Sequence, residues 1–110
     1  MEKYYFKTSK IYAEAYLLNG KMIVLKGSIA NKYCLSSFPE ALNNIRKELI
    51  SSGVLIEKAD KLVFTENFSC SSPSQASALI NGSSSNGLLA WKDSFGKTLK
   101  SKLRNVWSKY

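Results

Sequence analysis

Hydrophobic and polar positions alternate near the start of the chain in a pattern that predicts antiparallel strands. The alternation is clearest over residues 11–18 and 21–26, and Asn19-Gly20 separates these two runs. Asn-Gly between two β-rich runs is the strongest short hairpin signal, because both central residues need a positive φ. We therefore predict a β-hairpin here, followed by a loop over residues 28–37.

The spacing of apolar residues then changes to three and four, which predicts a helix over residues 38–51. Pro39 is tolerated in the first turn of such a helix, where its missing N–H costs nothing. Gly53 suits the left-handed position just after the helix end. The apolar positions of this helix are Ala41, Leu42, Ile45, Leu49 and Ile50.

A second, shorter hairpin is predicted over residues 54–65, with its turn at Lys58-Ala59-Asp60 and a loop over residues 67–72. Ser72-Pro73 then repeats the helix-start signal, with Ser at the N-cap and Pro at the first helical position. Asn81-Gly82 is expected to end this short helix.

The last third predicts an ordered polar loop over residues 82–87, a short strand over 88–91, a turn over 93–96 and a helix over 98–110. The apolar stripe of that last helix consists of Leu99, Leu103, Val106, Trp107 and Tyr110. Together the elements predict one α+β domain spanning residues 1–110. Its antiparallel sheet has about five strands, two hairpins plus one, with two to three helices packed on it.

Composition agrees with a soluble globular domain. Hydrophobic residues make up 45% of the chain and charged residues 22%, which are ordinary values. No run approaches the roughly 18 apolar residues that span a bilayer, and the first residues lack the apolar core of a signal peptide. We therefore expect a cytoplasmic monomer that avoids the membrane, with Cys34 and Cys70 as free thiols.

The charge of the chain is more informative about its partners than its overall composition is. The chain carries 16 basic and 8 acidic residues, a net charge of +8. Residues 1–55 and 56–110 each hold eight basic and four acidic residues, so the excess is not confined to a tail. Such a field attracts polyanions and raises their encounter rate. The alternative is a surface that is charged only for solubility.

Several kinds of chemistry are missing from the sequence. There is no His, which removes the commonest general base and metal ligand. The acidic residues form no tight cluster, and no Gly-rich phosphate loop is present. We therefore expect a protein that is not an enzyme, with no catalytic residues, no metal site and no cofactor.

The segment 72–98 has both a structural and a functional interpretation. Its structural residues are Pro73, Gly82, Gly87 and Trp91, which start a helix, form turns and anchor the core. Its remaining polar side chains offer hydrogen bonds and charge near a helix N-terminus, where phosphate is readily bound. These candidate nucleic-acid contacts are Ser74, Gln75, Asn86, Lys92 and Lys97.

Basic residues continue into the C-terminal helix at Lys100, Lys102 and Arg104. They are interpreted either as cations that follow a phosphate backbone or as side chains that flank an amphipathic core helix. A helix lying on a membrane surface is a third interpretation. The N-terminal aromatic residues also have two interpretations, because they suit either base stacking or the core. These are Tyr4, Tyr5, Phe6, Tyr12 and Tyr16.

Residues 72–98 also resemble the signature of an uncharacterised bacterial domain of unknown function that is found C-terminal to GIY-YIG endonuclease domains and in restriction-modification contexts. The matching residues are Ser72-Pro73-Ser74, Ala76, Gly82, Asn86-Gly87, Trp91-Lys92 and Gly96-Lys97-Thr98-Leu99. Ser77 stands where this family usually has a second Ala, and Leu89 where an aromatic residue is common.

The resemblance covers roughly residues 10–100, since Lys26-Gly27-Ser28 and the Gly53 turn also fit the family's pattern. It implies an accessory domain of nucleic-acid enzymes, without the nuclease half that carries the G-I-Y and Y-I-G strands. We therefore expect a non-catalytic accessory module that binds nucleic acid, with DNA as the leading ligand, and that works beside a nuclease domain. The alternative is a protein-interaction or structural domain that docks a protein partner.

Overall fold

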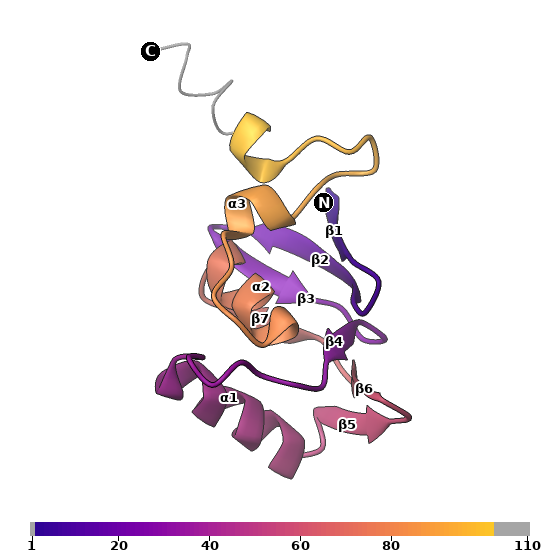
Figure 1. The fold of residues 1–110 in the computed structure, drawn as a ribbon. Helices are drawn as coiled ribbons and strands as arrows, with labels where there is room; N and C mark the ends of the chain where they lie inside the picture. The colour runs from indigo at the N-terminus through magenta and orange to yellow at the C-terminus, as the bar shows by residue number, and fades with distance from the viewer. Residues whose placement is uncertain (1, 103–110) are drawn as a thin grey trace.

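The computed structural model describes residues 2–102, which form a mixed α+β fold around one antiparallel sheet of seven strands (Figure 1). The strand order is β5-β6-β4-β2-β3-β7, and β1 pairs with β2 outside this path. The strands are β1 (Lys3–Lys7), β2 (Tyr12–Leu18), β3 (Lys21–Val24), β4 (Ile29–Asn31), β5 (Leu55–Lys58), β6 (Lys61–Phe64) and β7 (Phe68–Cys70). The helices are α1 (Glu40–Ser51), α2 (Pro73–Asn81) and α3 (Gly87–Ala90). The predicted fold class is confirmed.

Both predicted hairpins are present. In the first, Asn19 and Gly20 adopt φ values of 51° and 80°, which join β2 to β3 through the expected two-residue turn. In the second, Ala59 adopts a φ of 56° between β5 and β6. An Ala in this region is uncommon, because its Cβ crowds the following carbonyl oxygen.

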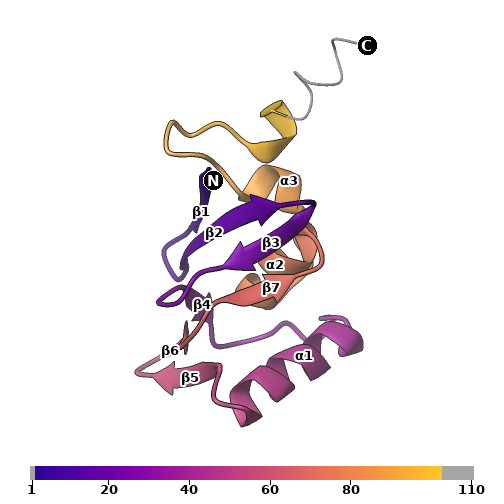
Figure 2. The ribbon, with the colours of Figure 1, turned by 180° about the vertical axis from the view of Figure 1, so that it is seen from behind.

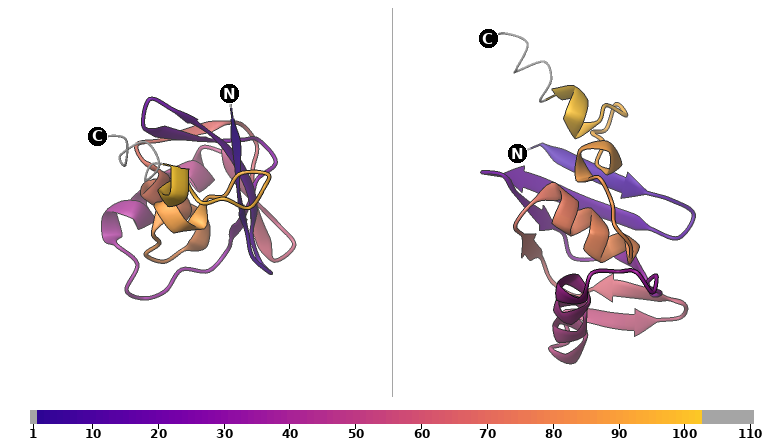
Figure 3. Two further views of the ribbon diagram at one scale, coloured as in Figure 1. Left: turned by 90° about the horizontal axis from the view of Figure 1, so that it is seen from above. Right: turned by 60° about the vertical axis from the view of Figure 1, so that its left-hand side comes forward.

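The core lies between one face of the sheet and the helices. Seen from above, the helices lie on a single side of the strands (Figure 3). Inward-facing residues of the first three strands are buried, among them Tyr4, Phe6, Ala13, Ala15, Met22 and Val24. Phe6 meets the fully buried Trp91 edge to face, with ring centroids 5.7 Å apart. This pair ties β1 to the segment that follows α3.

The helix ends follow the sequence signals closely. Ser72 caps α2 by accepting a hydrogen bond from the Gln75 N–H, and Gly82 ends it with a φ of 77°. The first helix begins one residue after Pro39, which is therefore the N-cap and not part of the first turn. Gly53 has the predicted positive φ, at 82°.

Two predicted loops contain short strands. Residues 28–37 include β4, and residues 67–72 include β7. Each strand has only three residues, too few to show an alternating pattern. They exist because their partners, β6 and β3, lie beside them in the folded chain.

The strand predicted over residues 88–91 is wrong, because α3 lies there instead. Asn86 caps this helix by accepting a hydrogen bond from the Leu88 N–H. The run of apolar residues after a capping Asn therefore forms one helical turn. The predicted C-terminal helix starts at Leu99, and its remaining residues, including Leu103, Val106, Trp107 and Tyr110, lie outside the described part.

One buried cation joins α1 to the rest of the fold. The Arg46 guanidinium is almost fully buried and donates to the carbonyl oxygens of Leu79, Asn31 and Lys32, the last two at 2.5 and 3.2 Å. Desolvation lowers the pKa of Arg46, although the group stays charged at neutral pH. Because these carbonyls belong to α2 and to the end of β4, Arg46 links three elements.

Replacing Arg46 with Met is expected to lower the free energy of unfolding by about 3 kcal/mol, because buried carbonyl oxygens lose their donors. Urea denaturation followed by circular dichroism measures this change. The control is Lys47→Met on the exposed side of the same helix, which should change stability by less than about 0.5 kcal/mol. Equal effects of the two substitutions would contradict this account of Arg46.

Candidate functional site

The sheet formed by β1, β2 and β3 has one face that no described helix covers (Figure 2). Successive side chains of a strand point to opposite faces, so every second residue lies there. These residues are partly or fully exposed, whereas their neighbours on the strands are mostly buried. We call this surface the open face; its residues are Lys3, Tyr5, Lys7, Tyr12, Glu14, Tyr16, Leu18, Lys21 and Ile23.

The strand register places one carboxylate among three aromatic rings. Glu14 lies directly opposite Tyr5 in the β1–β2 pair. Tyr12 and Tyr16 are two residues away from Glu14 on β2, and therefore on the same face. Tyr12 is 44% exposed, so its ring remains accessible to a ligand.

Lysine ammonium groups lie against these rings. Lys7 Nζ is 5.0 Å from the centroid of Tyr5 and 5.2 Å from that of Tyr12. Lys3 Nζ is 6.0 Å from the Tyr16 centroid and 3.7 Å from Glu14 Oε1. Contacts of this length between exposed groups are weak, so the lysines are free to move to a stronger anionic partner.

The segment after α3 adds Lys92 to the open face. Lys92 pairs with Tyr5 at the outer edge of β1, through hydrogen bonds of 2.7 and 3.0 Å between their backbones. Directly paired residues present their side chains on the same face of a sheet, so Lys92 lies beside Tyr5. Its side chain is exposed.

A groove of about 720 Å³ runs between this part of the open face and the loop that follows α3. From the strands it is lined by Tyr5, Lys7, Tyr12 and Glu14, and from the loop by Lys92, Asp93 and Ser94. The groove therefore combines aromatic rings, cations and two carboxylates, of which Glu14 makes a single long ion pair and Asp93 is engaged within the loop.

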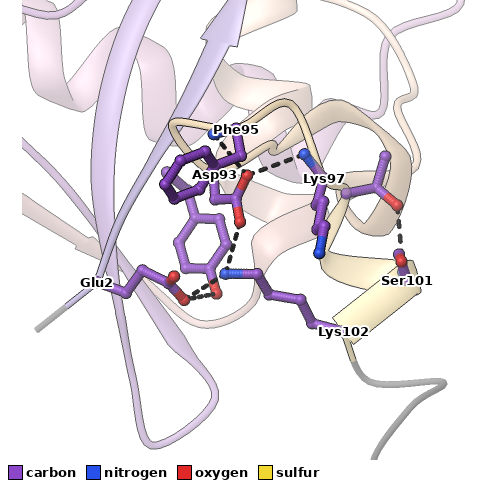
Figure 4. A network of polar contacts seen from close by, with 8 residues as sticks. Glu2, Asp93, Phe95, Lys97, Ser101 and Lys102 are labelled. Atoms are coloured by element: carbon purple, nitrogen blue, oxygen red, sulfur yellow. Dashed lines mark hydrogen bonds and ion pairs between the residues drawn. The ribbon is translucent and has the colours of Figure 1, made fainter.

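The loop that forms one wall of the groove is held by Asp93 (Figure 4). Asp93 Oδ1 accepts hydrogen bonds from the backbone N–H groups of Phe95 and Lys97, both at 2.9 Å. Its Oδ2 lies 2.9 Å from Lys102 Nζ, and the same ammonium lies 2.5 Å from Glu2 Oε1. The turn after α3, the start of the last helix and the N-terminus are thus joined at one cation.

These contacts shift the pKa values of all three side chains. The hydrogen bond from Lys102 is the main cause that lowers the pKa of Asp93, followed by the backbone donors. Lys102 likewise lowers the pKa of Glu2, with a further contribution from the Tyr4 hydroxyl. Partial desolvation alone would lower the pKa of Lys102, but the hydrogen bonds to Glu2 and Asp93 raise it overall.

The cations predicted to bind nucleic acid do not share one surface. Lys92 lies on the open face, and Lys97 and Lys100 are exposed beyond it. Lys102 is committed to Glu2 and Asp93. Arg104 lies outside the described residues.

The predicted polar contacts belong to the helix layer, on the other side of the sheet from the open face. Ser74 Oγ accepts from the Gly87 N–H at 3.0 Å, and Gln75 Oε1 accepts from the Ser71 N–H at 2.8 Å. Asn86 caps α3. These side chains therefore build the helix ends, and the structure does not bring them together with Lys92.

The residues expected to be structural have clear packing roles. Trp91 is fully buried and donates from Nε1 to the Pro73 carbonyl oxygen at 3.0 Å. A Cβ added to Gly82 would overlap the carbonyl oxygen of Tyr33, and one added to Gly87 would overlap the backbone between Pro73 and Ser74. Both glycines thus allow chain segments to approach closely.

The aromatic set found in the sequence divides between the two sides of the sheet. Tyr4 and Phe6 belong to the core, whereas Tyr5, Tyr12 and Tyr16 belong to the open face. Sequence reasoning did not single out Lys3, Lys7 or Glu14. The weak alternation along residues 3–7 and the clearer alternation along residues 12–16, combined with the hairpin, are the sequence signals that point to them.

The remaining reactive side chains give no competing site. Within residues 2–102, no three His, Cys, Asp or Glu side chains lie close enough together to hold a metal ion. Cys34 is exposed and Cys70 is buried, and both are free. Burial raises the pKa of the Cys70 thiol to about 12, which keeps it protonated and unreactive at neutral pH.

Fold and site together define a small α+β domain with an uncovered, lysine- and tyrosine-bearing sheet face. The chain belongs to the family described as "Domain of unknown function (DUF4357)", which matches residues 4–103. No curated protein and no solved structure matches it. In the described part of the chain, every helix is too short or too polar to cross a membrane.

Acid is expected to loosen the contacts around Lys102. Asp93 and Glu2 have folded-state pKa values below their ordinary values of 3.8 and 4.5, so they contribute stability above those values that is lost as the pH falls through the lowered ones. Thermal unfolding at a series of pH values should therefore show a marked loss of stability below about pH 4. In Lys102→Met this acid-side loss should be smaller, whereas Lys100→Met should behave as the natural protein does. Parallel curves for all three proteins would contradict the assignment.

Replacing Gly87 with Ala is expected to destabilise the fold by about 2 kcal/mol, because the added methyl group overlaps the start of α2. Ser84→Ala in the same polar loop is the control, with an expected change within about 0.5 kcal/mol. Urea denaturation of both variants checks this, and a Gly87→Ala protein as stable as the control would show that α2 and α3 can separate at little cost.

Proposed function

We propose that this chain is a non-catalytic accessory domain that binds single-stranded nucleic acid through its open face, with DNA as the expected ligand. One observation carries the proposal: three tyrosines and four lysines share a sheet face that no described helix covers. These residues are Tyr5, Tyr12, Tyr16, Lys3, Lys7, Lys21 and Lys92.

The chemistry of this face matches that of a single strand. Unpaired bases expose planar faces that stack on aromatic side chains, at about 1–3 kcal/mol per base. The phosphates between them are neutralised by lysines, which hold the backbone without reading its sequence. A net charge of +8 would draw a polyanion toward the domain from a distance.

The proposed surface differs from the one that the sequence favoured. Of the predicted cations and polar contacts only Lys92 is common to both, because Lys102 is engaged in ion pairs and the polar residues of the 72–86 segment serve the helix ends. Tyr5, Tyr12 and Tyr16 belong to the aromatic set that the sequence offered for base stacking. Lys97 and Lys100 remain exposed but are not part of the open face.

We propose further that the domain works beside a nuclease in a restriction-modification or related system. This part rests on the resemblance of residues 72–98 to domains that follow GIY-YIG endonucleases. A domain that holds a strand without cutting it would keep a tethered nuclease near its substrate. Docking of a protein partner has less support, because most of the large exposed apolar side chains come from separate segments. They are Tyr12 and Leu18 on β2, and Tyr33, Leu35, Ile50, Ile56, Leu89 and Phe95 in other segments.

Binding is expected to be weak and strongly dependent on salt. Four phosphate contacts give a slope of about −2.8 for log K against log salt, so affinity should fall roughly fiftyfold between about 50 and 200 mM salt. Fluorescence anisotropy of labelled single-stranded DNA, single-stranded RNA and duplex DNA measures this. Absent or salt-insensitive binding would remove the proposal, and tighter binding to duplex would exclude base stacking.

Paired variants locate the surface. The double variant Lys7→Glu/Lys92→Glu should abolish binding, whereas Lys47→Glu/Lys58→Glu, with the same change in net charge, should weaken it only modestly. Tyr12→Ala should weaken single-strand binding by about tenfold, and Tyr33→Ala should leave it nearly unchanged. If both charge variants lose affinity equally, binding reflects net charge and the open face is not the site.

A further inference from the structure

The groove on the open face contains a feature that backbone binding does not require. A surface that only held phosphates would gain nothing from a carboxylate, because a carboxylate repels phosphate groups. Yet Glu14 lines the groove beside Tyr5 and Tyr12, and it is the open face's only acidic residue. Its one ion pair, to Lys3, is 3.7 Å long and partly exposed, so it is easily exchanged. Asp93, the other carboxylate of the groove, is already engaged by two backbone N–H groups and by Lys102.

We propose that the groove selects guanine, with Glu14 accepting hydrogen bonds from the edge of a base that lies against Tyr5 and Tyr12. This inference rests on the proposed binding of single strands and names the base that the groove prefers. The structural basis of the inference is the position of the Glu14 carboxylate beside the rings of Tyr5 and Tyr12.

The chemistry of the bases decides which one fits. An ionised carboxylate has two acceptor oxygens and no donor. Guanine presents two adjacent donors on its Watson–Crick edge, N1–H and the 2-amino group, which match both oxygens. Adenine and cytosine present one amino donor beside an acceptor nitrogen, and thymine or uracil presents one N–H between two carbonyl oxygens. Only guanine therefore meets Glu14 without placing an acceptor against it.

The rest of the groove suits the same ligand. Lys92 lies beside Tyr5 at the outer edge, and Lys7 lies over both rings. Both residues line the groove, so a base that displaces Lys7 from the rings would leave two ammonium groups near the phosphates on either side of it. The groove volume of about 720 Å³ leaves room for a purine.

The test uses labelled thymidine hexamers whose two central bases are guanine, hypoxanthine, adenine or thymine. Hypoxanthine is the matched probe, since it differs from guanine only in lacking the 2-amino group. Anisotropy should show guanine bound about tenfold more tightly than thymine, the discrimination typical of a paired contact, with hypoxanthine losing most of that advantage.

Glu14→Gln should reduce the preference for guanine over thymine to less than about twofold, because an amide replaces one acceptor oxygen with a donor. Glu48→Gln, an exposed carboxylate on α1, should keep the full preference. Circular dichroism confirms that both variants are folded.

Equal affinity for all four hexamers would overturn the guanine assignment, and so would a preference that survives Glu14→Gln. Either result leaves single-strand binding in place if affinity still depends on salt and on Lys7 and Lys92. Absence of binding by every hexamer and every longer strand overturns both proposals, whereas binding by longer strands alone overturns only the guanine site.

Discussion

The antiparallel pairing of β1 with β2 is the constraint on which the rest of this molecule depends. Each pair of opposed residues presents both side chains on the same face of the sheet. The register therefore determines which rows of side chains are buried and which are exposed. Tyr4 with Ala15 and Phe6 with Ala13 face the helices, where small alanines make space for large rings. A slip of one residue would bury lysines and expose the core.

That same pairing creates the open face as a by-product of making the core. Because Tyr4 and Phe6 must point inward, Lys3, Tyr5 and Lys7 must point outward. The outward-facing residues of β2 are Tyr12, Glu14 and Tyr16. The register places them opposite Lys7, Tyr5 and Lys3, respectively. Stability and the candidate binding surface therefore share one cause.

The segment after α3, although far from β1 in sequence, adds Lys92 to the open face. Trp91 is locked into the core by its contacts with Phe6 and with the Pro73 carbonyl, which fixes where Lys92 leaves the helix layer. Asp93 then turns the chain, and its contact with Lys102 brings the start of the last helix back to the N-terminus. One lysine is thereby placed on the open face while another is neutralised.

Local chemistry was enough to predict the hairpins, the C-terminal end of α1, both ends of α2 and the fold class, because Asn-Gly turns, Ser-Pro caps and helical spacing act within a few residues. Local chemistry could not identify β4 and β7, which exist only through distant partners, or α3, whose apolar run is equally typical of a strand. For the site, the sequence determined which cations and aromatic residues were available, and it pointed to Lys92 and the tyrosines. Which of them remain free depends on the folded arrangement, because the ion pair of Lys102 with Glu2 and the contact of Lys92 with Tyr5 join residues that are far apart along the chain.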